Sequence, residues 1–84
     1  MRTHTFFEDP GHGWLQVLKS ELPAGIYISP YSYQDSQFVY LEEDCDATTY
    51  RNAVGLTKAD IVTKYVDGQS HIRSMDGFSQ GMEA

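Results

Sequence analysis

The segment 37–55 constrains the fold of this chain most, because its pattern predicts a buried strand followed directly by a helix. In the stretch 38–41 (Phe-Val-Tyr-Leu), successive side chains point to opposite faces of a strand, and all four are hydrophobic. Apolar residues on both faces are typical of a strand inside a sheet that is covered on both sides. We therefore expect a central strand, which the polar link 34–36 joins in a hairpin to the stretch 31–33.

The acidic run 42–46 leads into the main predicted helix, over about 46–55. An apolar stripe at spacings i, i+3 and i+7 predicts one buried face, and a glycine ends the pattern. Asp44 or Asp46 is expected to cap the amino end, where acidic residues also suit the helix dipole. The stripe and the terminating glycine are Ala47, Tyr50, Val54 and Gly55.

The rest of the chain consists of short strand patterns separated by turns, so we predict a single α+β domain at 1–75 and a flexible C-terminal tail at 76–84. We expect a sheet of four or five strands, antiparallel or mixed, with the main helix on one face. One or two helical turns are expected near 18–22. The strands are expected among the strand-like patterns at 3–8, 14–17, 26–28, 60–66 and 70–75, together with the central hairpin.

An excess of acidic residues limits the partners that such a chain can bind. Twelve Asp and Glu against six Lys and Arg give a formal net charge of −6. Direct binding to nucleic-acid phosphates requires clustered bases, so we exclude it. The charge favours a protein with a basic surface as partner. An edge strand and six tyrosines also suit pairing with a second copy, so a homodimer is a further expectation.

Cys45 is the single cysteine of the chain, which excludes an internal disulfide. The carboxylates around it disfavour the thiolate, so we expect a buried, unreactive thiol. No run approaches the ~18 apolar residues needed to cross a bilayer, and the first residues lack the apolar core of a signal peptide. We therefore expect no membrane partner and a cytoplasmic location.

His12 lies between two glycines and close to Trp14, an arrangement that lets the backbone approach a ligand. A histidine in such a loop can bind a ligand or move a proton, but a tight turn whose histidine bonds to a neighbouring strand explains the pattern as well. Tyr31 and Tyr33 offer flat faces for stacking, or complete the core and its rim. His71 and Arg73 have the same two interpretations as His12, and a pairing with the acidic run is one hypothesis for them.

The acidic run itself has three interpretations. Glu42 and Asp44 share one face of an extended strand while Glu43 points away, so the carboxylates converge only in part and no metal site is predicted. With Asp46, they either cap the helix and solvate the strand end, or form a negative patch that faces a partner. The common phosphate-loop, dinucleotide, zinc-knuckle and nucleophile-elbow signatures are absent from the sequence. No cofactor and no catalytic residue are predicted.

Four blocks of the sequence, in order, form a recognisable pattern: 9–15 (DPGHGWL), 29–33 (SPYSY), 40–47 (YLEEDCDA) and 72–73 (IR). With them the chain resembles, over about residues 6 to 73, a family of small uncharacterised proteins from phage genomes and bacterial mobile elements. The resemblance implies an accessory protein of the bacterial host's cytoplasm, without an established activity. After the last block, the sequence lacks the aromatic and basic residues with which the family pattern ends.

The leading interpretation is a small non-enzymatic phage-type protein that is a binder or an inhibitor of a host protein. The alternative is a protein that binds or sequesters a small ligand, such as a nucleotide or another anion. A third is a small enzyme or metal protein in which a histidine works with a carboxylate. The candidate binding residues are His12, Trp14, Tyr31, Tyr33, Glu42, Glu43, Asp44, Asp46 and Arg73.

Overall fold

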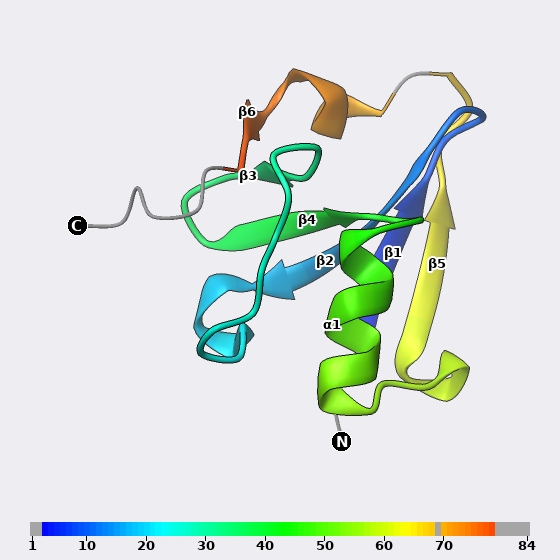
Figure 1. Ribbon diagram of the computed structural model, residues 1–84. Coiled ribbons are helices and arrows are strands. Elements are labelled where there is room, and N and C mark those ends of the chain that lie inside the picture. Colours follow the sequence, from blue (N-terminus) through cyan, green and yellow to red (C-terminus); the bar gives the residue numbers. More distant parts are fainter. Residues whose placement is uncertain (1–2, 69, 79–84) are drawn as a thin grey trace.

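A computed structural model describes residues 3–68 and 70–78 of the chain. These residues form a six-stranded mixed sheet with one α-helix packed against it (Figure 1). This is the α+β class that the sequence predicts, although the sheet is wider than the four or five strands expected. The elements are β1 (His4–Glu8), β2 (Gly13–Leu18), η1 (Lys19–Glu21), β3 (Tyr33–Gln34), β4 (Phe38–Glu42), α1 (Asp46–Val54), η2 (Lys58–Asp60), β5 (Ile61–Tyr65), η3 (His71–Ser74) and β6 (Asp76–Gly77).

The strands lie in the order β5-β1-β2-β4-β3-β6. The pair β1–β5 is parallel and the other neighbours are antiparallel. Because a parallel pair needs a crossover, the chain passes through α1 between β4 and β5. β4 lies between β2 and β3, and its three middle residues are buried, which confirms the predicted central strand. Tyr33 pairs with Tyr40 across the predicted hairpin.

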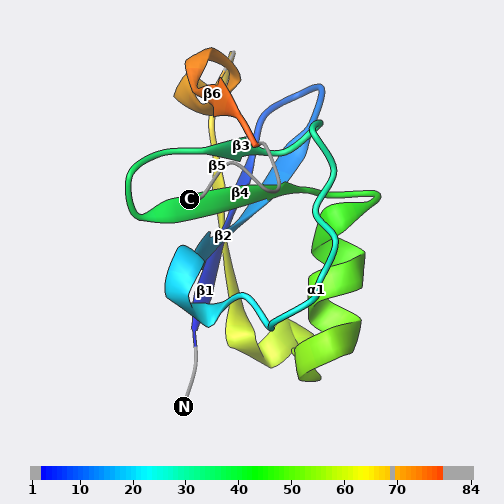
Figure 2. The ribbon, with the colours of Figure 1, turned by 60° about the vertical axis from the view of Figure 1, so that its left-hand side comes forward.

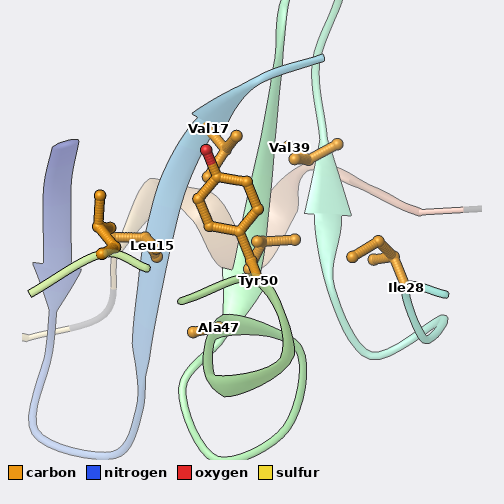
Figure 3. Close-up of a cluster of buried hydrophobic side chains, with 8 residues drawn as sticks. Leu15, Val17, Ile28, Val39, Ala47 and Tyr50 are labelled. Carbon is orange, nitrogen blue, oxygen red and sulfur yellow. The ribbon is translucent and has the colours of Figure 1, made fainter. Parts of the chain in front are cut away.

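The core has a part on each face of the sheet. On the helix face, Ala47 and Tyr50 of α1 lie over the apolar side chains of β2 and β4, with Ile28 at the edge (Figure 3). Each fully buried side chain of this kind contributes about 1.5–3 kcal/mol. The opposite face carries a smaller cluster of Trp14, Tyr40 and Ile72, with Phe7, Tyr33, Phe38 and Met75 packed against it.

α1 begins without the carboxylate cap that we expected from Asp44 or Asp46. The N-cap residue is Cys45, and no side-chain hydrogen bond caps this end. Asp46 bonds instead to two serines of the β2–β3 loop, because that loop crosses directly beside the start of the helix. The other end agrees with the prediction, since Gly55 has φ 72° and so adopts the left-handed conformation that ends many helices.

Three predicted segments differ from the structure. The stretch 26–28 is irregular, not a strand, because it runs along the helix face and places Ile28 in the core. The stretch 70–75 forms η3, since the Ser70 side chain accepts the N–H of Ile72 and starts a helical turn. The tail was expected from residue 76, but Asp76–Gly77 form β6 beside β3; residues 79–84 lie outside the described residues. The helical turns expected near 18–22 are η1.

Figure 2 shows α1 to one side of the strands, while the segment from η3 to β6 lies near the end of the sheet that carries the β1–β2 turn. β5 ends beside Glu8, whose carbonyl accepts the N–H of Val66, and Ser70 and Arg73 then bond to Asp9, so the chain after β5 stays at the end of the sheet that carries the β1–β2 turn. No helix in the described part of the chain has the length and apolar character required to cross a membrane.

Candidate binding site

The β1–β2 turn is built around the carboxylate of Asp9. Its Oδ1 accepts the backbone N–H groups of Gly11 and His12, each at 3.0 Å, and the backbone N–H of Asp9 donates to the carbonyl of His12 at 2.9 Å. A short acidic side chain that bonds to the backbone just after it is a common way to close a turn. The side chain of Asp9 is buried, while His12 is exposed at the turn.

The same carboxylate binds a residue near the other end of the chain. Nε and Nη2 of Arg73 donate to its two oxygens at 2.7 and 2.8 Å, and the backbone N–H of Ser70 donates at 3.0 Å. The hydrogen bonds from Arg73 hold the pKa of Asp9 well below its usual range, and backbone N–H groups add to the effect. A Cβ at Gly11 would lie 2.8 Å from Nη2 of Arg73, so the absent side chain gives the guanidinium room. Arg73 therefore pairs with Asp9, and the hypothesis that it pairs with the acidic run is wrong.

Arg73 also covers Trp14. The Cζ atom of Arg73 lies 5.6 Å from the centroid of the indole, within the range of a cation–π contact. Trp14 is almost fully buried, and the ring of Tyr33 meets it edge to face at 6.2 Å, with the ring of His12 at 5.9 Å. Because Trp14 pairs with Glu42 across β2 and β4, the Glu42 side chain lies on the same face of the sheet.

Asp46 fixes the segment that carries the tyrosines. Its buried carboxylate accepts the backbone N–H of Ser29 at 3.0 Å, the hydroxyl of Ser29 at 2.6 Å and the hydroxyl of Ser32. The Ser32 Oγ in turn accepts the backbone N–H of Glu42 at 3.0 Å. These bonds tie the loop to both α1 and β4, while Tyr31, between the two serines, remains 75% exposed.

These contacts surround an open hollow of about 410 Å³ on the sheet face opposite α1, which we call the aromatic hollow. Its volume falls within the range of about 300–1,000 Å³ that is usual for ligand sites. Its wall comes from the β1–β2 turn and the start of β2, the loop before β3, the end of β4, and η3. The lining residues are His12, Trp14, Tyr31, Tyr33, Glu42, Cys45 and Arg73.

Six of the nine predicted binding residues thus meet in one place, and three do not. Glu43 lines a different hollow, on the helix face. Asp44 is exposed and lines neither hollow, and Asp46 is buried among the serines. Cys45 was expected to be buried but is exposed at the aromatic hollow. The charge of Asp46 is the main cause that raises the pKa of Cys45, because a neighbouring anion disfavours the thiolate.

The charges of the aromatic hollow are unevenly balanced. Arg73 is neutralised by Asp9, whereas Glu42 forms no ion pair with any residue that the structure describes. The His12 ring makes no hydrogen bond to a carboxylate within residues 3–68 and 70–78, as an assembled acid–base pair would. Nowhere in the described chain do three His, Cys, Asp or Glu side chains gather as metal ligands do.

Sequence reasoning missed Asp9 as the residue that organises this site. The Asp-Pro-Gly turn was visible, and an aspartate at such a position is known to bond to the following backbone. Its partner Arg73, however, lies 64 residues away, so no local pattern could join the two. Arg51 and Lys58, which line the hollow on the helix face, were missed for the same reason.

Comparison of the chain with protein-family models, with curated proteins and with solved structures gives no significant match. The resemblance to a phage family therefore stays a prediction, and so do the binding roles of the positions that it marks. The geometry establishes an open, aromatic hollow with one unpaired carboxylate at one end of the sheet.

Proposed function

We propose that the protein is a small, non-enzymatic phage accessory protein that binds a basic surface of a bacterial host protein and inhibits it. The observation that carries the proposal is the meeting of six predicted binding residues, from separate segments, around the aromatic hollow. Trp, Tyr and Arg side chains are enriched at the energetic centres of protein interfaces. The hollow offers a recess for one partner side chain, with the exposed ring of Tyr31 beside it.

Charge favours a lysine or arginine as that side chain. Within the hollow, Glu42 is the acid that forms no ion pair with a described residue. The whole chain carries a net charge of −6, which accelerates the encounter with a basic surface and penalises an acidic one. A cation in the hollow would stack on tyrosine rings and face Glu42. If the basic surface normally binds nucleic acid, covering it would inhibit the host protein.

Affinity capture from a bacterial lysate tests the proposal. The wild-type protein should retain a host protein at low salt and release it as salt rises from about 50 to about 500 mM, because screening weakens the charge attraction. With the purified partner, Glu42→Gln and the double substitution Tyr31→Ala, Tyr33→Ala should each weaken binding about tenfold or more, as truncation of an interface centre does. Isothermal titration calorimetry measures this loss.

Asp67→Asn provides the matched control, because Asp67 is an exposed acid that lines neither hollow. It should bind the partner as the wild type does. Retention of no host protein at low salt would contradict the proposal, and so would equal retention by the wild type and the two hollow variants.

A planar small ligand in the same hollow is the second candidate, and the volume of about 410 Å³ together with the tyrosine rings favours it. A ligand that binds only the folded chain must raise the melting temperature. Thermal-shift screening with nucleotides and other small anions therefore tests this candidate. If no compound in the screen raises the melting temperature, the small-ligand candidate is excluded.

A homodimer stays a prediction as well. β5 is an edge strand of five residues, whereas β6 at the other edge has only two. Val62 and Tyr65 of β5 are exposed large hydrophobic residues. An edge of this kind is where a second copy would extend the sheet.

A further inference from the structure

A second hollow, between α1 and β5, lies on the helix face of the sheet and has no part in the proposed function. We call it the α1–β5 hollow. Its volume is about 330 Å³, near the lower end of the range for ligand sites. β2 contributes to both hollows, because Trp14 and Leu15 are successive residues that point to opposite faces. The lining residues are Phe6, Leu15, Glu43, Ala47, Arg51, Lys58, Ile61 and Thr63.

Two bases line this hollow. Arg51 comes from α1 and Lys58 from η2, and neither forms an ion pair with a residue that the structure describes. The Nε of Arg51 is buried and has no hydrogen-bond partner among those residues, in contrast to the Nε of Arg73. A buried N–H group without an acceptor is unfavourable. Arg51 also lines the hollow, so its guanidinium charge lies at the wall that a bound anion would meet.

Apolar side chains form most of the remaining wall. Phe6 and Ile61 come from neighbouring strands, and Ala47 lies one helical turn before Arg51. Gly13 determines where the Phe6 ring lies, because a Cβ at this position would be 2.3 Å from Cζ of Phe6. The ring thus lies against the backbone of β2 and closes one side of the hollow. A ligand that fills this space needs an apolar body beside its polar group.

Glu43 is the acid in the wall. Desolvation, followed by the nearby charge of Asp44, raises the pKa of Glu43 above its usual value. It therefore takes up a proton more readily than an ordinary glutamate, and a protonated carboxyl can donate a hydrogen bond to an anion. Even when Glu43 is ionised, two bases against one acid leave the wall with a net positive charge.

From this arrangement we infer that the α1–β5 hollow binds a small amphipathic anion, namely a carboxylate or phosphate group on a short apolar chain. The anionic head accepts charge-assisted hydrogen bonds from Arg51 and Lys58. The apolar chain lies on Phe6 and Ile61, away from water. Because this site is on the other face of the sheet, it does not depend on the aromatic hollow.

Titration of the ¹⁵N-labelled protein, followed by amide chemical shifts, tests the inference with four probes. Hexanoate and hexyl phosphate carry both parts of the ligand, inorganic phosphate carries only the charge, and hexanol carries only the chain. At least one of the two amphipathic anions should bind, with shifts at Arg51 and Thr63, and the tighter one identifies the head group. Inorganic phosphate and hexanol should bind at least about tenfold more weakly, since each lacks one set of contacts.

Arg51→Gln and Lys58→Gln should each lower the affinity for the amphipathic anion about tenfold. Lys64→Gln is the matched control, because Lys64 is an exposed base of β5 that does not line the hollow. Lys58 is exposed, so its substitution keeps the test valid if Arg51→Gln affects folding. Absence of binding by both anions up to about 10 mM, or affinities that survive both substitutions, would overturn the inference.

Discussion

Asp9 accepts hydrogen bonds from two N–H groups of its own turn, from the N–H of Ser70, and from two nitrogens of Arg73. The first two bonds shape the β1–β2 turn, and the others hold η3 against it. Because Arg73 also covers Trp14, the position of the aromatic wall depends on this carboxylate. A residue that does not itself line the hollow thus brings together the elements that do.

Replacement of Asp9 by asparagine tests this role through pH. The pKa of Asp9 is lower in the folded chain than in the unfolded chain, where it is about 3.9. Its ionised form therefore stabilises the fold fully above about pH 5, and this contribution is lost as pH falls below that value. Asp9→Asn should be less stable than the wild type at pH 7, and the difference should shrink between about pH 5 and pH 2.

Urea unfolding followed by the fluorescence of Trp14, the single tryptophan, measures the free energy of unfolding at each pH. Asp67→Asn removes an exposed acid and should follow the wild-type profile. A constant difference between Asp9→Asn and the wild type across this pH range would contradict the prediction.

At the level of elements, the start of α1 is joined to the β2–β3 loop by Asp46. Its carboxylate binds Ser29 and Ser32, which flank Tyr31, and Ser32 also binds the backbone of β4. The helix, the loop and the central strand are therefore fixed to one another at a single buried group. This arrangement places the exposed Tyr31 ring at the aromatic hollow.

Asp46→Asn should lower the free energy of unfolding by about 1–3 kcal/mol, because it weakens several hydrogen bonds to a buried charged acceptor. It should also speed hydrogen exchange at the amides of Ser29 and Glu42, whose N–H groups depend on this network. Asp44→Asn, at an exposed neighbouring acid, should change stability by less than about 0.5 kcal/mol. Equal stability losses in the two variants would show that Asp46 has no special role.

The elements that the sequence predicts well are those with a local cause. Two-sided apolar periodicity identifies β4, and an apolar stripe ended by Gly55 identifies α1. Stretches that depend on distant partners were predicted less well. Segment 70–75 has the composition of a strand, yet the N–H of Ser70 bonds to Asp9, and the segment forms a helical turn. The meeting of Arg73 with the β1–β2 turn follows from the same contact, so it could not be predicted from spacing.

On the scale of the whole molecule, the sheet separates two hollows whose walls come from neighbouring residues. Trp14 and Glu42 line the aromatic hollow, and the next residue in each case, Leu15 or Glu43, lines the α1–β5 hollow. β4 ends at Glu42 and Glu43 begins the turn that follows, so these two carboxylates line hollows on opposite faces of the sheet. The acidic run therefore does not form a single site, although the negative charges of Asp44 and Glu42 still act on Glu43.

Glu43→Gln should reveal the cost of that repulsion. The pKa of Glu43 is raised in the folded chain by desolvation and by nearby carboxylates, so its ionised form destabilises the fold above its folded pKa. Glutamine should therefore raise the free energy of unfolding at pH 7. The gain should vanish below about pH 4, where the wild-type side chain is protonated in both states. This profile has the opposite sign to that of Asp9→Asn, and urea unfolding of both variants over the same pH series measures it.

Added salt should reduce the part of the gain in stability that comes from repulsion between like charges. If Glu43→Gln is instead less stable than the wild type at pH 7, the Glu43 carboxylate has a favourable partner at neutral pH, and the prediction is wrong.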